Sequence, residues 1–147
     1  MSVLEFCVSY NAVDFEQTSA FYTDVLNFTP SVSWNRADGR GAFFVGEGNG
    51  VVEIFAAAKG ELPYKAPPPD SFMIVIVVDD VDTYHDFVVG NGAEIRWPIE
   101  EYEWGRWFGV LDPNNVGIYF MQRLGENVAI ARAALRKAVM VRQENDA

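Results

Sequence analysis

The chain has 147 residues, half of them hydrophobic and 14% aromatic, which is enough for one compact domain or two small modules that share a core. Its formal net charge of −10 disfavours nucleic acids and anionic membranes as partners, because their phosphates would be repelled. The single cysteine, Cys7, excludes an internal disulfide, and no apolar run is long enough to span a bilayer. With no signal-peptide pattern at the start, we expect a cytoplasmic protein.

The charge is unevenly spread along the chain. Residues 1–122 contain 18 acidic and 6 basic side chains, a net charge of −12, whereas residues 123–147 contain 3 acidic and 5 basic ones, a net charge of +2. An acidic body favours a cationic small ligand. The alternative is that the charge serves solubility alone.

The first part of the chain predicts a strand, a helix and three further strands. A run of β-forming residues predicts a strand at Val3–Tyr10. A helix is expected to start at Asp14, since acids occupy its first turn, and to end at Asn27, a residue type that tolerates the left-handed conformation. Turn-forming residues separate three strands, expected at Ser31–Asn35, Gly41–Val45 and Val51–Ala56.

The same order of elements recurs after a proline-rich linker at residues 58–70. An apolar run predicts a strand at Phe72–Val78, and apolar spacing predicts a helix at Asp80–Asn91 that Gly92 ends. Three more strands are expected at Ala93–Trp97, Arg106–Leu111 and Val116–Met121.

Several landmarks recur at an offset of 66 residues. Asp14 follows Cys7 by 7 residues, and Asp80 follows Met73 by the same number. Phe21 corresponds to Phe87. The offset predicts an α+β fold built from two βαβββ modules, residues 1–57 and 71–122. The alternative is one β-rich domain with coincidental spacings.

Residues 123–147 lie outside the repeat. Beyond Asn127, side chains recur at helical spacing, namely Val128, Ala131, Leu135, Val139 and Arg142. This pattern predicts an appended amphipathic helix, which needs a surface to cover. Docking of that helix on a partner protein is one function that the sequence leaves open.

Two motifs resemble those of the vicinal oxygen chelate superfamily, which includes glyoxalase I, extradiol dioxygenases and the fosfomycin- and bleomycin-resistance proteins. The segment Ser19–Phe28 resembles the end of that family's first helix, and Asp112–Asn115 resembles its "DPDGN" turn. Asn27 and Asn115 stand where glycine is usual, and asparagine permits the left-handed conformation. The resemblance implies two modules whose mixed sheets curl around a cleft, a small-molecule ligand and a homodimer.

The resemblance also locates the family's four metal-ligand positions, at Cys7, Glu53, Met73 and Tyr119. Only Glu53 has a side chain of the usual type, whereas a catalytic divalent ion needs about three nitrogen or carboxylate ligands. The one histidine, His85, falls on the second predicted helix, outside the cleft. We therefore expect no metal and no other cofactor, and we expect Cys7 to be an inert thiol because nothing in the sequence activates it.

Strand alternation predicts a cleft lined by aromatic side chains, methionines and Glu53. A second concentration of aromatic and acidic residues, Trp97–Phe108, is expected to form a connection between strands that contacts the ligand. The alternatives are a filled core for the apolar positions and a dimer interface for this segment. The predicted ligand-binding residues are Trp34, Glu53, Phe55, Trp97, Glu101, Trp104, Trp107, Tyr119 and Met121.

The leading hypothesis is a metal-free binding protein, similar to the bleomycin-resistance proteins, that sequesters a small aromatic or cationic molecule. The alternative is a metal-independent lyase or isomerase of the same fold. In that enzyme Glu53 would act as general base and Tyr119 as hydrogen-bond donor, the only candidate catalytic residues that the sequence offers. Of these two hypotheses, the sequence favours the binding protein over the enzyme.

Overall fold

The computed structural model describes residues 7–37, 39–57, 64–69 and 71–125. The expected start of the first strand at Val3, part of the expected linker and the expected terminal helix from Asn127 lie outside these residues. Among the described helices, none is long and apolar enough to cross a membrane.

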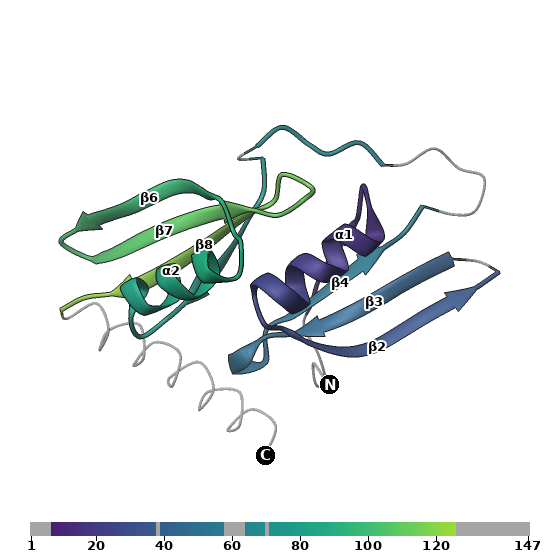
Figure 1. Cartoon of the computed structure of the whole chain (residues 1–147), viewed down its shortest axis with the longest axis horizontal. Coiled ribbons are helices and arrows are strands. Elements are labelled where there is room, and N and C mark those ends of the chain that lie inside the picture. Colours follow the sequence, from purple (N-terminus) through teal and green to yellow (C-terminus); the bar gives the residue numbers. More distant parts are fainter. Residues whose placement is uncertain (1–6, 38, 58–63, 70, 126–147) are drawn as a thin grey trace, which may run out of the picture.

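The first half of the chain forms one four-stranded sheet covered by a helix (Figure 1). Its strands lie in the order β1-β4-β3-β2, with β1 parallel to β4 and the other neighbours antiparallel. The helix begins as α1 and continues as the π-helical η1, and a short 3-10 turn, η2, precedes the last strand. The elements are β1 (Val8–Asn11), α1 (Phe15–Ala20), η1 (Phe21–Val25), β2 (Thr29–Arg36), β3 (Gly39–Val45), η2 (Glu47–Asn49) and β4 (Val51–Phe55).

The second half repeats this arrangement. Its sheet has the order β5-β8-β7-β6, again with the first strand parallel to the last. The elements are β5 (Met73–Val77), α2 (Val81–Gly90), β6 (Ile95–Tyr102), β7 (Gly105–Leu111) and β8 (Gly117–Arg123). Four pairs of elements start 66 residues apart, at Phe15 and Val81, Thr29 and Ile95, Gly39 and Gly105, and Val51 and Gly117. The predicted α+β fold with two βαβββ modules is confirmed.

Local sequence signals explain where both helices begin and where the first one ends. The Asp14 side chain accepts a hydrogen bond from the Gln17 amide at 2.9 Å, and Asp80 caps α2 in the same way. The first helix ends before Asn27, whose φ of 56° is left-handed as expected, and Asn115 has a φ of 62°.

The aromatic segment Trp97–Phe108 differs from the expectation of a connecting loop. It forms most of the β6–β7 hairpin, whose turn is the pair Glu103 and Trp104. Aromatic and branched residues favour strands, and Pro98 is tolerated because β6 is an edge strand with register shifts on both sides of Trp97.

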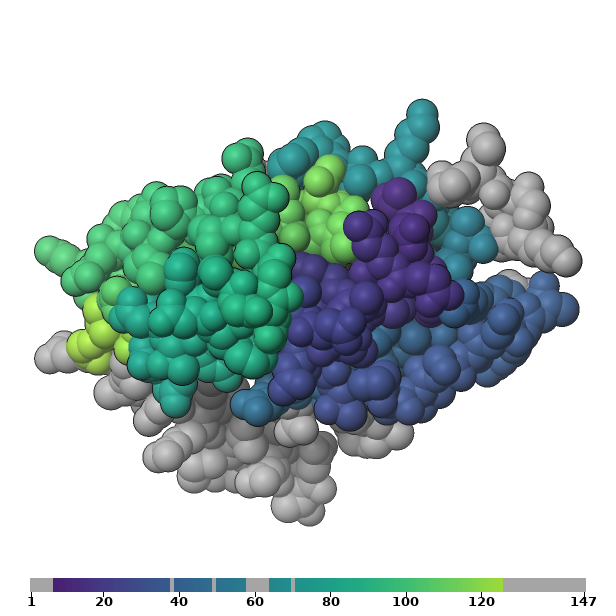
Figure 2. Space-filling model, in the orientation of Figure 1, coloured from purple at the N-terminus to yellow at the C-terminus, as the bar shows by residue number. Residues whose placement is uncertain are grey.

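The two modules share one core. Both helices lie on the same side of the molecule (Figure 1), and the surfaces of the two modules meet in Figure 2. Buried side chains from both halves form a single apolar cluster, which includes Tyr22, Phe44, Ile54, Phe108, Ile118 and Phe120. Within each module, an aromatic ring of the helix stacks on the sheet, Tyr22 on Phe44 and Tyr84 on Phe120.

A buried polar network joins the modules. The Tyr10 hydroxyl donates to Asp112 at 2.6 Å and lies 2.7 Å from the Tyr22 hydroxyl. Burial, together with the charge of Asp112, raises the pKa of both phenols far above the usual value. Asn114 accepts a hydrogen bond from the Val13 amide at 2.6 Å. The DPNN turn of the second module is thus anchored in the first.

Candidate functional site

Each sheet has one face packed against its helix and one face that no helix of the described residues covers, which we call the open face. In the second module, Phe108 and Ile118 are fully buried on the helix side. Because successive strand residues alternate, Trp107 and Tyr119 lie on the open face. The predicted ligand-binding residues, Glu101 excepted, gather on the open faces or at the hairpin end beside them.

The open face of the first sheet carries an aromatic cluster around Trp34. The Trp34 ring lies 5.5 Å from the ring of Phe43 and 5.9 Å from that of Phe55, measured between centroids. Trp34 is paired with Gly41 across the strands, and a Cβ added to Gly41 would lie 2.2 Å from the indole. The glycine therefore leaves the space in which the indole lies on the sheet.

Glu53 lies beside this cluster, in register with Phe43 on one side and Ser9 on the other. The Ser9 hydroxyl donates a hydrogen bond to Glu53 Oε2 at 2.5 Å, and the Cys7 thiol lies 3.6 Å from the same hydroxyl. Glu53 and Cys7 are half-buried. This contact orients one carboxylate oxygen of Glu53 and leaves the other with capacity to accept a donor or pair with a cation.

The open face of the second sheet carries a larger cluster around Tyr119. The Tyr119 ring stacks on Trp97 at a centroid distance of 4.8 Å and lies 5.0 Å from Trp107. As in the first module, a tryptophan lies over a glycine, because a Cβ on Gly109 would be 2.8 Å from the Trp97 ring. The guanidinium of Arg96 lies 5.7 Å from the Trp97 ring centroid, so this indole already attracts a cation.

The cluster extends to the end of the β6–β7 hairpin. Tyr102 and Trp104 stack almost in parallel, with 5.3 Å between centroids and 7° between planes, and both are more than two-fifths exposed. The Tyr102 hydroxyl donates to Glu100 at 2.6 Å, and this bond and the charge of Glu100 raise the pKa of the phenol. Exposed rings beside a carboxylate suit a planar cation.

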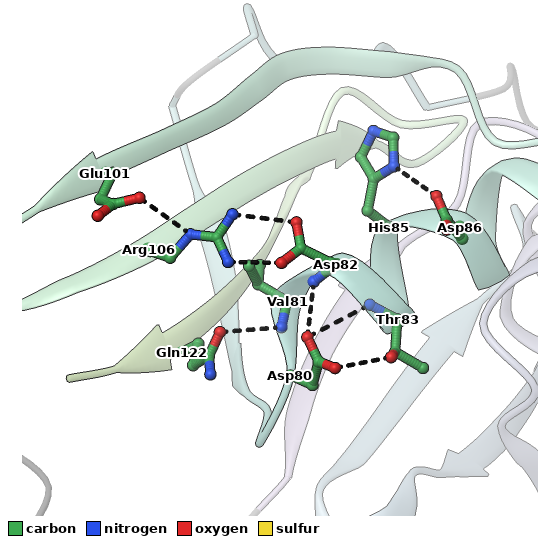
Figure 3. A network of polar contacts seen from close by, with 9 residues as sticks. All are labelled: Asp80, Val81, Asp82, Thr83, His85, Asp86, Glu101, Arg106 and Gln122. Carbon is green, nitrogen blue, oxygen red and sulfur yellow. Dashed lines mark hydrogen bonds and ion pairs between the residues drawn. The ribbon is translucent and has the colours of Figure 1, made fainter.

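Glu101 lies on the helix side of the sheet, away from the other predicted ligand-binding residues (Figure 3). Its Oε2 is 3.4 Å from Arg106 Nε, close enough for an ion pair but without hydrogen-bond geometry. The Arg106 guanidinium also binds both carboxylate oxygens of Asp82 on α2, at 2.5 and 3.0 Å. We therefore leave Glu101 out of the candidate site.

The family's metal-ligand positions do not form a metal site that suits a divalent ion. Cys7 directly precedes β1, Glu53 lies on β4 of the first sheet, and Met73 and Tyr119 lie on the second sheet. Glu53 is the only carboxylate or imidazole among these four side chains. Within the described residues, no group of three His, Cys, Asp or Glu side chains is placed to hold a metal ion. His85 lies on α2, with its ring 5.2 Å from that of Phe108.

A groove runs between the modules along β5, whose Val75 and Val77 lie on the open face of the second sheet in register with Tyr119 and Met121. It has a volume of about 1280 Å³, and none of the predicted ligand-binding residues is among the described residues that line it. The sequence prediction of a cleft around Glu53 and Tyr119 is thus met by two open sheet faces rather than by this groove.

Sequence reasoning missed Phe43, Glu100 and Tyr102 as members of the open faces. Phe43 could have been found, since it alternates with Gly41 on a correctly predicted strand. Glu100 and Tyr102 were assigned to a loop, and the register shift after Trp97 places both of them, rather than Glu101, on the open face. No short-range signal in the sequence shows such a shift.

Solved structures share this fold. FosX, a genomically encoded fosfomycin resistance protein from Listeria monocytogenes, superimposes with a TM-score of 0.67 at 17% identity, over 86% of this chain and 98% of the other. A glyoxylase/bleomycin resistance protein/dioxygenase domain from Frankia sp. EAN1pec gives a TM-score of 0.64 at 21% identity, over 84% and 99% of the two chains. TnmS3, an antibiotic binding protein from Streptomyces sp. CB03234, gives a TM-score of 0.62 at 18% identity, over 84% of this chain and 100% of the other.

These likenesses show the fold, and the sequence itself shows the family. Among curated proteins, none matches the chain significantly. The model of one family, however, matches residues 6–120, which is most of the chain. The chain therefore belongs to the Glyoxalase/Bleomycin resistance protein/Dioxygenase superfamily.

Proposed function

We propose that this chain is a binding protein that sequesters a small, planar, cationic molecule without a catalytic metal. The observation that carries the proposal is the open face of the second sheet, where the clustered rings of Trp97, Trp107 and Tyr119 continue into the exposed stacked pair Tyr102 and Trp104. Glu100 adds a negative charge beside these rings. Flat aromatic surfaces next to a carboxylate bind planar cations by stacking and cation–π attraction.

Two further observations support this function. The four family metal positions hold a poor donor set, so chemistry that depends on a divalent ion has little support in these residues. One of the proteins of the same fold, TnmS3, is described as an antibiotic binding protein. An antibiotic or secondary metabolite is accordingly the class of ligand that we propose, with a cytoplasmic site of action.

The alternative of a metal-independent enzyme has weaker support. Its proposed base, Glu53, lies on the first sheet, while its proposed hydrogen-bond donor, Tyr119, lies among the rings of the second sheet. The Ser9–Glu53 bond is the one feature that would suit a positioned base. We propose instead that Glu53 serves as a polar anchor on the first open face.

We also propose a homodimer, as the family resemblance implies. Each module carries its own aromatic open face, and we propose a two-fold arrangement in which the first-module face of one chain lies near the second-module face of the other. Light scattering at several protein concentrations tests this assembly, and a strictly monomeric mass would contradict it.

Tryptophan fluorescence provides the test of binding. We expect 9-aminoacridine, a planar cation, to quench the fluorescence at lower concentrations than acridine, which has the same shape and is neutral at pH 7.5. Trp104→Ala should weaken 9-aminoacridine binding by roughly tenfold, which corresponds to about 1.4 kcal/mol of lost stacking and cation–π attraction.

The matched control is Phe87→Ala, which removes an aromatic ring of similar exposure from α2 on the helix side of the sheet. This variant should bind 9-aminoacridine as the wild type does. The proposal fails if neither acridine binds, or if Trp104→Ala and Phe87→Ala weaken binding equally.

A further inference from the structure

The groove between the modules runs along the open edge of β5, which is an edge strand of its sheet. Its walls come from both modules, with Phe28 and Val51 on one side and Val75, Val77 and Phe87 on the other. Its volume of about 1280 Å³ exceeds the roughly 300–1,000 Å³ of typical small-molecule pockets. The size favours a segment of polypeptide over a small ligand.

The groove exposes apolar side chains that water solvates poorly. Val75 is 45% exposed, Val77 is 53% exposed and Phe87 is 39% exposed. Neighbouring apolar side chains of this size indicate a surface that another element covers. An uncovered edge strand would also offer unpaired backbone groups for aggregation.

The rim of the groove is acidic. Glu47 of the first module and Asp79 of the second both line it. Both carboxylates act on the Tyr84 phenol, whose pKa is raised mainly by burial and then by these two charges. The two acids therefore converge on one place, where they favour a cationic occupant.

We propose that residues 127–142 of the same chain form an amphipathic helix that lies in this groove. The described chain approaches the groove at its end, because β8 runs parallel to β5 and the Val78 amide donates to the Met121 carbonyl at 2.9 Å. Two residues after β8, Gly125 has a left-handed φ of 62°, which lets the chain reverse its direction.

The composition of this segment matches the groove. Four of its apolar residues, Val128, Ala131, Leu135 and Val139, recur at helical spacing, and its basic residues are Arg132, Arg136, Lys137 and Arg142. Residues 123–147 carry 5 basic and 3 acidic side chains, a net charge of +2 against −12 for residues 1–122. A helix of 16 residues spans about 24 Å, enough to cover the roughly 17 Å of a five-residue strand and reach the first module.

Hydrogen–deuterium exchange of the full-length protein tests the proposal. We expect the amides of residues 130–142 to be protected in the wild type by at least a hundredfold. Leu135→Asp places a charge on the apolar face and should abolish most of this protection. Ala133→Asp places the same residue on the opposite face of the predicted helix, and it should retain the protection.

A second pair of variants probes the groove itself, in case Leu135→Asp disturbs folding. Val77→Asp should expose the same amides, whereas Val32→Asp should leave them protected, because Val32 is 56% exposed on β2 and does not line the groove. The proposal is overturned if the segment is unprotected in the wild type, or if Val77→Asp leaves its protection intact. Protection that appears only at concentrations where a dimer forms would overturn it too, because the occupant would then be the segment of a second copy.

Discussion

At the scale of single residues, two glycines shape the open faces. A glycine inside a strand usually weakens it, since it has no side chain to pack and loses more backbone entropy on folding. Here Gly41 and Gly109 each lie opposite a tryptophan whose ring covers the glycine. The indole supplies the packing that the glycine lacks, and the glycine lets the indole lie flat on the sheet.

This arrangement predicts the effect of adding one methyl group at Gly41. Gly41→Ala should destabilise the protein by about 1–3 kcal/mol, because the new Cβ would lie 2.2 Å from Trp34 and 2.9 Å from the Ile54 carbonyl oxygen. Urea unfolding followed by circular dichroism gives the free energy, and the tryptophan emission reports the displaced ring.

Gly50→Ala is the control for this prediction. Gly50 has an ordinary φ of −68°, and no neighbour among the described residues lies within 4 Å of an added Cβ. Its substitution should be neutral or stabilise the protein by up to about 1 kcal/mol, because alanine restricts the unfolded chain. Equal effects at the two glycines would show that Trp34 does not occupy the space above Gly41.

At the scale of elements, the sequence predicted the order of the described strands and of the two helices that cover the sheets, whereas it predicted a turn where the structure has the 3-10 helix η2. Regular signals made the correct predictions possible: aspartate caps, asparagine at a helix end, and apolar alternation repeated at an offset of 66 residues. The hairpin of β6 and β7 was only partly predicted. The position of Trp97–Phe108 between two predicted strands suggested a connection, but sheet pairing at a tolerant edge position extends β6 into this segment.

The candidate site was predictable to the same degree. Alternation placed Glu53, Phe55 and Tyr119 on the faces that are open in the structure, because their strands were correctly located. Trp34 was predicted from the correspondence between the two modules, and it lies on the same open face as Glu53. Alternation could not separate Glu101 from Glu100, since a register shift in β6 decides which of these neighbours points towards the helix. The Ser9–Glu53 bond joins residues 44 positions apart, and only the pairing of β1 with β4 brings them together.

The start of α2 shows how charges stabilise one element. Asp80 caps the helix, Asp82 binds Arg106 of β7, and the Val81 amide donates to Gln122 of β8 at 3.2 Å (Figure 3). Hydrogen bonds from Thr83 lower the pKa of Asp80, and the Arg106 hydrogen bond lowers that of Asp82. The negative charges therefore favour the folded state, in which they also face the positive end of the helix dipole.

These lowered pKa values predict how stability depends on pH. The unfolded chain binds protons at its ordinary carboxyl pKa of about 4, before the folded chain does. The stabilisation is thus complete above about pH 4 and is lost as the pH falls through the lower folded-state pKa values. Asp82→Asn should flatten the decline of the urea midpoint between pH 5 and pH 2.

Asp86→Asn is the matched control on the same helix, because the side chain of Asp86 is exposed and its polar contact drawn in Figure 3 is with His85 alone. The urea midpoint of this variant should decline between pH 5 and pH 2 as steeply as that of the wild type. Salt near 1 M should make the pH dependence of the wild-type urea midpoint more like that of Asp82→Asn, since exposed charges are screened. The prediction would be contradicted if the urea midpoint of Asp82→Asn declined at low pH as steeply as that of the wild type.

At the scale of the whole molecule, the two modules are copies whose corresponding turns have diverged. The turn that starts at Asp112 corresponds, at the offset of 66, to the turn that starts at Gly46. The second-module turn inserts Asn114 into the first module, where it is 1% exposed. The first-module turn instead lines the groove along β5. The turn that starts at Asp112 therefore acts as a clamp, because its hydrogen bonds join the two modules. The turn that starts at Gly46 lines the groove between them.

The clamp predicts that the modules unfold as one unit and that Asn114 is critical to this. Its amide accepts from the Val13 amide and donates to the Thr18 hydroxyl at 3.0 Å, and Thr18 is fully buried. Asn114→Ala should cost about 2–4 kcal/mol, because it leaves buried polar groups in the first module without partners. Urea unfolding should show this loss, and hydrogen exchange should show faster exchange of the Val13 amide.

Asn91→Ala offers the comparison, since Asn91 also bridges the modules but does so at the surface. Its side chain donates to the Val25 carbonyl at 3.2 Å, and water can replace that bond. We therefore expect the free energy of unfolding to fall by less than about 1 kcal/mol and the exchange rate of the Val13 amide to stay unchanged. Similar losses for both variants would mean that burial of the DPNN turn does not hold the modules together. A second unfolding transition in Asn114→Ala alone would show that the turn is what makes the two halves cooperate, because a shared core without it would then be too weak to couple them.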